Sequence, residues 1–354
     1  MPFLRLLLFP ISVLYGLITY CRNKMYDWGF FKSTSFQIPI ISIGNLEVGG
    51  SGKTPMVEYL IKLLASDYKI STLSRGYGRQ TKGFRWVKPD DLAKHSGDEP
   101  LQIKQKFETI GVAVSENRII GIKEIEKHYN LILMDDAYQH RAVKPGLSLL
   151  LFDYQSLKKP SILLPAGNYR EIISGKYRSH VMIVSKCPIG LTNQEKEEII
   201  KHLQPKKSQK VFFTSIVYQQ ELKSVFSSHT LTINDIQKET GVILLTGIAK
   251  PKPLVNQLKK FTNHVLHHQY LDHHIFTPKN MLKLANDFES LKNAQKIVIT
   301  TEKDAMRLNN IEFKQILEKV PIYYWPIQVE FAQHDKLNFE KLIKEYAQSN
   351  QRIS

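Results

Sequence analysis

The sequence contains very few cysteines, and this scarcity excludes several kinds of protein. Only Cys21 and Cys187 occur among its 354 residues. Two cysteines cannot build a disulfide framework or a cysteine-ligated metal site, and their scarcity fits a reducing compartment. The sequence also lacks zinc-finger spacing, a basic leucine zipper and an aromatic RNA-binding signature, which are the usual marks of nucleic-acid-binding modules.

Acidic residues are under-represented relative to basic ones. The chain has 49 Lys and Arg against 33 Asp and Glu, a formal net charge of +16. Such an excess indicates an anionic partner, which could be a nucleic acid, an anionic lipid surface or a phosphorylated substrate. Composition alone does not choose among them, but without a recognisable module we expect no nucleic acid.

The bulk composition is that of an ordinary globular protein. Hydrophobic residues make up 42% and charged residues 23% of the chain, which argues against disorder and against a protein with many membrane spans. The length predicts two domains, each large enough to bury its own core.

The N-terminal segment contains a long stretch without charged residues. Sixteen residues without charge, 6–21, lie between Arg5 and Arg22, which is short of the ~20 needed to span a bilayer. Tyrosines and Trp28 supply interfacial aromatic side chains. A cleaved signal peptide lacks its small-residue site here, and a core helix is the other alternative. We predict a membrane-docking helix within residues 1–28, with basic flanks that meet anionic headgroups.

Short apolar β-rich runs alternate with helical patterns along the rest of the chain. Examples are the runs 131–134 and 147–152 and the helical pattern 278–293. This alternation predicts an α/β fold with mostly parallel sheets. We expect a P-loop domain over 29–210, a β-stranded linker over 211–228, and a smaller α/β domain with a helical tail over 229–354.

A glycine-rich loop follows the apolar run 38–43 and precedes a helical pattern. Its backbone N–H groups and the helix N-terminus suit the phosphates of ATP. In a loop of this type the lysine reaches the β- and γ-phosphates and the next hydroxyl coordinates Mg²⁺. Glu47 stands where the common pattern has its first glycine. The loop residues are Val48, Gly49, Gly50, Ser51, Gly52, Lys53 and Thr54.

Three further motifs carry possible chemistry. The apolar run 131–134 ends in Asp135 and Asp136, which predicts a Walker B element that holds Mg²⁺. Asp98 lies in a Gly-Asp-Glu-Pro turn and could accept a proton, and Arg75 lies among glycines, where it could bind phosphate. His273 offers an acid–base group in an Asp-His-His sequence. The histidines between 264 and 268 show no clean zinc spacing.

Together these motifs resemble the tetraacyldisaccharide 4′-kinase family, which phosphorylates a lipid A precursor in Gram-negative bacteria. The resemblance covers residues 1 to about 310 in order. The matching stretches are 44–46, 49–55, 74–79, 97–100, 135–140, 164–167, 170–171, 272–274 and 301–304. The sequence departs from the family pattern at Ala137-Tyr138 and at Asn168-Tyr169.

The resemblance implies a kinase that moves the γ-phosphate of ATP to the 4′-hydroxyl of a tetraacyldisaccharide 1-phosphate at the cytoplasmic face of the inner membrane. It implies that Asp98 takes the proton of that hydroxyl and that His273 pairs with Asp98. It also implies that Arg118 and Arg170 meet phosphate or substrate. An alternative is a membrane-associated ATPase switch acting through partners, but those proteins carry a lysine where this chain has Val48.

Overall fold

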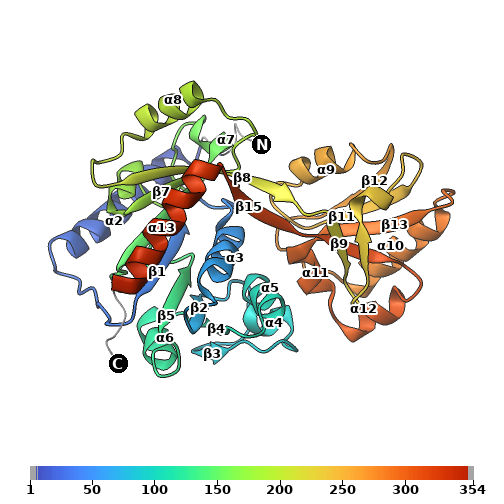
Figure 1. Ribbon diagram of the computed structural model, residues 1–354, viewed down its shortest axis with the longest axis horizontal. Coiled ribbons are helices and arrows are strands. Elements are labelled where there is room, and N and C mark those ends of the chain that lie inside the picture. The colour runs from blue at the N-terminus through green and yellow to red at the C-terminus, as the bar shows by residue number, and fades with distance from the viewer. Residues whose placement is uncertain (1–4, 6, 350–354) are drawn as a thin grey trace.

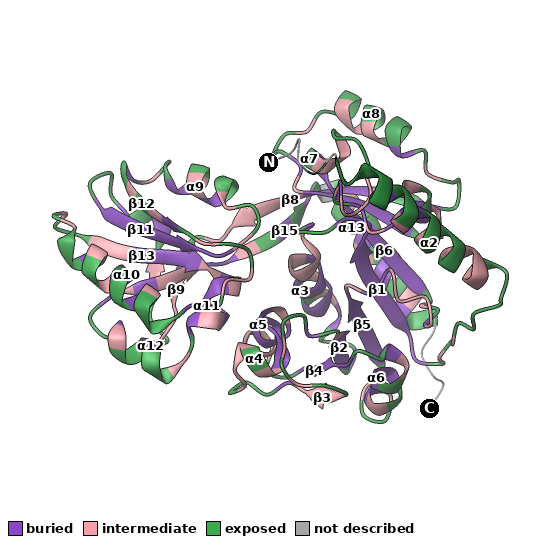
Figure 2. Ribbon diagram, turned by 180° about the vertical axis from the view of Figure 1, so that it is seen from behind, coloured by how far each residue is buried: buried purple, intermediate pink, exposed green. Residues whose placement is uncertain are grey.

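The chain folds into two α/β lobes that lie side by side in the computed structural model (Figure 1). The structure describes residue 5 and residues 7–349. Each lobe is built on its own sheet, of nine and six strands respectively. The strands carry most of the buried residues, whereas the outward faces of the helices are exposed (Figure 2). The predicted α/β class is confirmed.

The larger sheet belongs to the N-terminal lobe and is mostly parallel. Its order is β15-β8-β7-β6-β1-β5-β2-β4-β3, and only the edge strands β15 and β3 run antiparallel to their neighbours. The strands are β1 (Ile40–Asn45), β2 (Ile70–Ser74), β3 (Arg85–Trp86), β4 (Gly111–Val114), β5 (Leu131–Asp135), β6 (Leu147–Asp153), β7 (Val181–Ser185), β8 (Lys210–Tyr218) and β15 (Ile327–Phe331).

Helices cover both faces of this sheet, which explains why its central strands are continuous apolar runs rather than alternating ones. They are α2 (Phe9–Asp27), α3 (Lys53–Leu64), α4 (Ala93–Ser96), α5 (Asp98–Lys106), α6 (Arg118–Ile125), α7 (Tyr154–Leu157), η1 (Ile173–Arg178), α8 (Asn193–Leu203) and α13 (Gln333–Ser349). In β1, Ile43 lies opposite Asp135 of β5 and Leu149 of β6. The strand before the glycine-rich loop is therefore the direct neighbour of the strand that ends in aspartate.

The smaller sheet has the order β10-β9-β14-β13-β11-β12. Its strands are β9 (Glu221–Ser224), β10 (Thr230–Thr232), β11 (Gly241–Thr246), β12 (His264–Gln269), β13 (Lys296–Thr301) and β14 (Ile322–Trp325). Its helices are η2 (Ile233–Asp235), α9 (Lys252–Leu258), α10 (Pro278–Ser290), α11 (Glu302–Leu308) and α12 (Ile311–Ile316).

The C-terminal part of the chain differs from the predicted division into domains. The prediction assigned 229–354 to the second domain, but β15 pairs antiparallel with β8 and joins the larger sheet. The two strands form a ribbon between the lobes, and α13 lies across the N-terminal lobe (Figure 1). Phe339 and Ile343 of α13 are fully buried in the core of that lobe. The helical tail therefore returns to the first domain because its apolar face completes that core.

The N-terminal helix α2 docks on the first lobe through one narrow face. The Ser12 hydroxyl donates to the carbonyl of Leu163 at 3.0 Å and accepts from the amide of Ala166 at 2.9 Å. A Cβ at Gly16 would come within 2.6 Å of the Leu163 side chain, so α2 packs closely on this segment. Among the helices of the described residues, none is long and apolar enough to cross a membrane. Residues 1–4 and 6 of the predicted helical segment lie outside the described residues.

Candidate active site

The glycine-rich loop connects β1 to α3, as the sequence predicts. Gly49 and Gly52 have φ of 103° and 86°, a left-handed backbone that only glycine adopts without strain. Ser51 is buried, whereas Val48 to Gly50 are exposed. Glu47, at the departing position, is buried and bridged to Tyr169 on a strand-like backbone. Position 47 therefore has an extended backbone that does not require glycine, and the left-handed turn of the loop lies at Gly49.

Lys53 and Thr54 begin α3, and Lys53 points toward the end of β5. Its Nζ lies 3.2 Å from Oδ1 of Asn45 and 3.5 Å from Oδ1 of Asp136. Nη1 of Arg170 lies 2.8 Å and 3.0 Å from the two oxygens of Asp136. Burial alone raises the pKa of Asp136, but the charges of Lys53 and Arg170 outweigh it and lower the pKa. Asp136 is thus an ionised carboxylate beside the loop.

Asp135 is fully enclosed beneath Asp136. Its Oδ1 has no hydrogen-bond partner among the described residues. Burial, with the negative charges of Glu99 and Asp136, raises the pKa of Asp135 to about 7. A buried carboxylate with an unpartnered oxygen next to a second carboxylate favours a divalent cation with oxygen ligands. The chemistry of the two aspartates therefore suits Mg²⁺, and Thr54 lies at the start of α3, directly after Lys53.

Two further predicted arginines, Arg118 and Arg75, lie near each other, and Arg118 also lies near the two aspartates. Arg118 begins α6 after the Asn117 side chain caps it. It is buried, donates to the carbonyl of Ser115 at 2.7 Å, and has an Nε without a partner among the described residues. Burial lowers the pKa of Arg118 to about 10, while the charges of Asp135 and Asp136 act in the opposite direction. The exposed Arg75 contributes to the same electrostatic environment.

Asp98 and His273 come together from different lobes. Asp98 begins α5 after Gly97, whose φ of 92° turns the chain into the helix. His273 lies in the loop between β12 and α10, and its Nδ1 is 3.2 Å from Oδ2 of Asp98. The rings of Tyr77 and His273 lie 4.9 Å apart. The predicted pair is therefore assembled only where the lobes meet.

The charge around Asp98 is strongly positive. Burial raises its pKa, but the hydrogen bond with His273 and the charges of Lys303 and Arg307 outweigh burial and leave the pKa lowered. Nε of Arg307 lies 3.6 Å and Nζ of Lys303 lies 4.0 Å from Oδ2 of Asp98. No role was predicted for these two residues. Lys303 belongs to the Thr-Glu-Lys-Asp stretch, residues 301–304, that matches the family. That motif was the sequence signal for Lys303, whereas Arg307 lies outside it.

At the two departures from the family pattern the tyrosines are buried, whereas Asn168 is exposed. Tyr138 is buried, and its hydroxyl donates to the carbonyl of Gly175 at 2.7 Å. Asn168 accepts a hydrogen bond from Arg5, and Tyr169 is buried.

The histidines of β12 form no metal centre. Each has a protein partner: His264 lies 3.0 Å from Glu239, His267 lies 2.8 Å from Thr246, and His268 lies 2.9 Å from Asp287. In the part of the chain that the structure describes, no three His, Cys, Asp or Glu residues are grouped to hold a metal ion.

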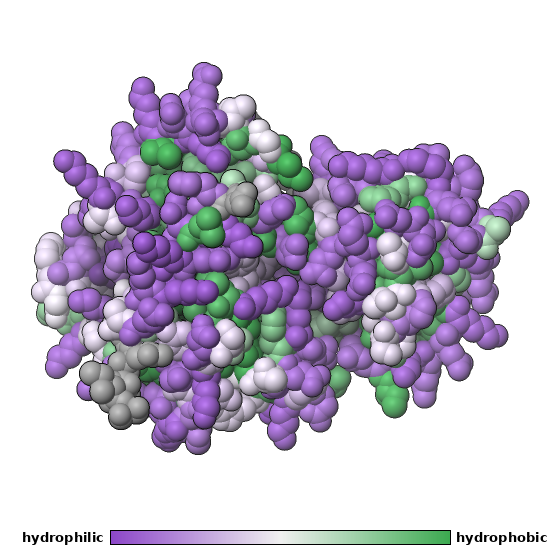
Figure 3. Space-filling view, in the orientation of Figure 1, coloured by the Kyte–Doolittle hydropathy of each residue, from purple (hydrophilic) through white to green (hydrophobic). Residues whose placement is uncertain are grey.

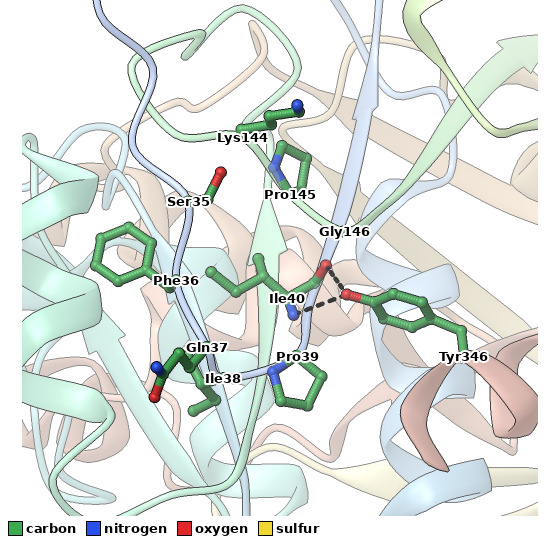
Figure 4. Close-up of a pocket in the computed structure, with 10 residues that line it drawn as sticks. All are labelled: Ser35, Phe36, Gln37, Ile38, Pro39, Ile40, Lys144, Pro145, Gly146 and Tyr346. Carbon is green, nitrogen blue, oxygen red and sulfur yellow. Dashed lines mark hydrogen bonds between the residues drawn. The ribbon is translucent and has the colours of Figure 1, made fainter. Parts of the chain in front are cut away.

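A small cavity of about 130 Å³ lies at the opposite end of β1 from the glycine-rich loop (Figure 4). There the Tyr346 hydroxyl bonds to both the amide and the carbonyl of Ile40. These contacts fasten α13 to the edge where β1 begins. None of the predicted catalytic, phosphate-binding or metal-binding residues lines this cavity.

A phosphate-binding loop, an aspartate pair at the neighbouring strand and a carboxylate–histidine pair beside them define a P-loop phosphotransferase. The comparisons with known proteins specify the family. The profile of the family described as LpxK, Tetraacyldisaccharide-1-P 4′-kinase, matches residues 4–348. The chain belongs to this family of kinases.

Curated relatives and a solved structure agree with this family. The chain is 42% identical to the tetraacyldisaccharide 4′-kinase of Flavobacterium johnsoniae, over 99% of both chains. It is 40% identical to that of Phocaeicola vulgatus, over 98% of this chain and 96% of the relative. The crystal structure of LpxK from Aquifex aeolicus in complex with ATP has a TM-score of 0.72 at 28% identity, and the match covers 97% of this chain and 99% of that one.

Proposed function

We propose that this protein transfers the γ-phosphate of ATP to the 4′-hydroxyl of a tetraacyldisaccharide 1-phosphate, a lipid A precursor. The observation that carries the proposal is the contact between Asp98 and His273, at 3.2 Å. A carboxylate kept ionised next to a nucleotide loop is what a kinase needs to accept the proton of an acceptor hydroxyl. An ATPase would use such a group to position a water molecule instead, so the identity of the acceptor decides between the two.

In the proposed reaction the 4′-oxygen forms a bond to the γ-phosphorus while the bond from that phosphorus to the bridging oxygen of ADP breaks. The hydroxyl proton goes to Asp98. Backbone N–H groups of residues 48–52 and Lys53 hold the β- and γ-phosphates. Thr54, Asp135 and Asp136 would hold Mg²⁺, which would neutralise the phosphate charge.

The acceptor brings a second phosphate, and the arginines suit it. Arg170 pairs with Asp136, and Arg118 lies near both aspartates and near Arg75. A guanidinium binds phosphate through paired hydrogen bonds. Because Arg170 pairs with Asp136 in the structure, we propose that it exchanges this carboxylate for a phosphate when the substrates bind. The net charge of +16 fits an anionic acceptor in an anionic membrane.

The decisive test is to incubate the protein with γ-labelled ATP and an acylated disaccharide 1-phosphate. We expect the label to appear in the lipid fraction, and to do so only when the acceptor has a free 4′-hydroxyl. A methyl ether at that hydroxyl is the matched control. Release of labelled inorganic phosphate with no labelled lipid would contradict the proposal and favour an ATPase.

Asp135→Asn is expected to raise the Mg²⁺ concentration for half-maximal activity at least tenfold, because the amide removes a negative ligand oxygen at a buried site. The measurement is a Mg²⁺ titration at saturating ATP, with Asp67→Asn, an exposed residue after α3, as control. An unchanged Mg²⁺ requirement would remove Asp135 from the metal site.

We also propose that α2 docks on the cytoplasmic leaflet of the inner membrane. The face opposite the buried Ser12 and Gly16 presents apolar side chains at helical spacing. Leu7, Ile11, Leu14 and Ile18 are 74%, 54%, 57% and 59% exposed. An amphipathic helix of this kind buries its apolar face at the headgroup boundary. The opposite face of the molecule, seen in Figure 3, is mostly hydrophilic, with apolar side chains in scattered spots.

The loop that carries His273 adds support for an acylated acceptor. Leu271 and Ile275, two residues to either side of His273, are 84% and 81% exposed. Four acyl groups on two sugars place an acyl-bearing carbon close to the 4′-hydroxyl. Apolar side chains next to the base therefore suit the acyl chains that arrive with that hydroxyl.

Charging the apolar face of α2 is expected to release the protein from membranes. The variant Leu14→Glu with Ile18→Glu should move most of the protein from the vesicle pellet to the supernatant, because two carboxylates oppose insertion near anionic lipids. Sedimentation with vesicles containing an anionic phospholipid measures this. Leu282→Glu, at a similarly exposed position on α10 (53%), is the control and should still sediment. Full sedimentation of the double variant would count against α2 as the anchor.

A further inference from the structure

The Thr301–Asp304 stretch has no part in the proposed reaction so far, yet its lysine lies beside the catalytic pair. β13 ends at Thr301, and α11 begins at Glu302. Nζ of Lys303 lies 2.9 Å from Nε2 of His273 and 3.0 Å from Oε1 of Glu99. Lys303 therefore bridges the histidine of one lobe and the helix of the other lobe that carries Asp98.

The chemistry of these contacts fixes where the proton of His273 sits. A lysine ammonium has only donors, so Nε2 of His273 must accept from Lys303 and carry no proton. A neutral imidazole then has its proton on Nδ1, the nitrogen that lies 3.2 Å from Asp98. The hydrogen bond therefore runs from His273 to Asp98, and the carboxylate is the acceptor.

We propose that Lys303 is a positioning residue for the phosphoryl transfer. Its ammonium selects the Nδ1–H tautomer of His273, and through it keeps Asp98 unprotonated as the base for the acceptor hydroxyl. This proposal rests on the proposed function of the Asp98–His273 pair. With Nε2 occupied by Lys303, His273 orients and stabilises Asp98 and does not itself take the proton of the hydroxyl.

The surroundings keep Lys303 charged and in place. Burial lowers the pKa of Lys303, but the carboxylates of Glu99 and Asp98 outweigh burial, with a further contribution from Asp272, and leave the pKa raised. On its own helix, Arg307 pairs with Asp304 at 2.7 Å and points its Nε at Asp98. The ammonium thus faces carboxylates from α5 and from the His273 loop.

A separate ionic contact holds α11 against α5. Nζ of Lys106 on α5 lies 2.8 Å from Glu302 on α11 and 2.6 Å from Glu58 on α3. These three side chains are largely buried, so the contact is shielded from salt and water. The start of α11, and with it Lys303, is therefore fixed relative to both Asp98 and the helix of the phosphate loop.

Two substitutions test whether the charge and donor of Lys303 matter, rather than the bulk of its side chain. Lys303→Met removes the hydrogen-bond donor and the positive charge but keeps the length of the side chain. Lys303→Arg keeps the donor and the charge. We expect Lys303→Met to lower kcat about 10–100-fold, as loss of an orienting partner typically does, with little change in ATP affinity. We expect Lys303→Arg to recover most of the rate.

The pH profile is the measurement that a merely structural role would not move. Removing a positive charge near Asp98 raises the pKa of that carboxyl, so the base forms only at higher pH. The acid limb of kcat/KM should therefore shift upward by about one pH unit in Lys303→Met, and stay near the wild-type position in Lys303→Arg. Lys279→Met, an exposed lysine of α10, should leave it unchanged. A reduced rate with an unmoved acid limb would overturn the proposal.

A double-mutant cycle tests whether Lys303 acts through the histidine. If it does, adding Lys303→Met to His273→Gln should lower kcat less than twofold further, because contacts that work as a unit are not additive. Fully multiplicative losses would show that Lys303 acts independently of His273.

The tautomer can be observed without any substrate. Nitrogen-15 NMR of the histidine-labelled protein, with the His273→Gln variant used for assignment, should show Nδ1 protonated and Nε2 unprotonated. Lys303→Met should move the population toward the Nε2–H form. The Nε2–H tautomer in the unmodified protein would overturn the proposal. Because this result does not depend on the acceptor, it stands apart from a failure of the lipid kinase assay.

Discussion

Replacing Lys53 by alanine is expected to lower kcat/KM at least 10²–10³-fold, because a fixed positive charge at the transferring phosphate is usually a large contribution to catalysis. The structure explains why no neighbour can substitute. Lys53 reaches Asn45 and Asp136 from the first turn of α3. Arg170 lies in the segment between α7 and η1 and is already paired with the carboxylate of Asp136. The measurement is label transfer from ATP at varied ATP concentration.

Lys62→Ala is the matched control for this variant, since Lys62 lies exposed on the same helix. It should keep near-normal activity, and both variants should unfold at similar temperatures. Near-normal turnover of Lys53→Ala would show that this loop does not hold the reacting phosphates.

Asp98→Asn is expected to lower kcat about 10²–10⁴-fold while leaving the affinity for ATP unchanged. The amide keeps the shape of the carboxylate but cannot take a proton, and a positioned base typically contributes that much. The contacts of Asp98 support the split between rate and affinity. Its partners among the described residues are the amide of Glu99, together with His273, Lys303 and Arg307. None of them belongs to the nucleotide loop.

A separate measurement of nucleotide binding distinguishes a loss of kcat from a loss of ATP affinity. Titration with a non-hydrolysable ATP analogue should give equal dissociation constants for Asp98→Asn and the unmodified protein. Asp90→Asn, an exposed aspartate before α4, should change neither quantity. An unchanged kcat in Asp98→Asn would remove this residue from the mechanism, and a loss confined to ATP affinity would assign it to nucleotide binding instead.

The local elements of this protein could be predicted from the sequence because their signals are local. The loop over residues 48–54 is flanked by an apolar β-rich run and a helical pattern, and β1 and α3 form at those places. The aspartates at the end of β5 follow from the same pattern. The buried parallel strands can be recognised in the sequence as continuous apolar runs, because both faces of such a sheet are covered.

The path of the chain between the lobes could not be predicted in this way. A β-rich run such as 327–331 carries no mark of its partner, and its pairing with β8 depends on two segments about a hundred residues apart. The helical tail shows an apolar stripe in sequence, but the stripe does not say which core it completes. Only the packing of Phe339 and Ile343 against the larger sheet assigns it to the first lobe.

The sequence by itself determined the phosphate loop, the aspartates and the family, because each depends on residues that are neighbours in the chain or on a fixed order of short motifs. The tertiary structure decided how the proposed catalytic pair, Asp98 and His273, is assembled and charged. Asp98, His273 and Lys303 come from three separate segments, and their chemistry depends on distances of 3.2 Å and 2.9 Å. Hydrogen-bond direction and pKa are properties of such contacts, so they arise only when the two lobes meet.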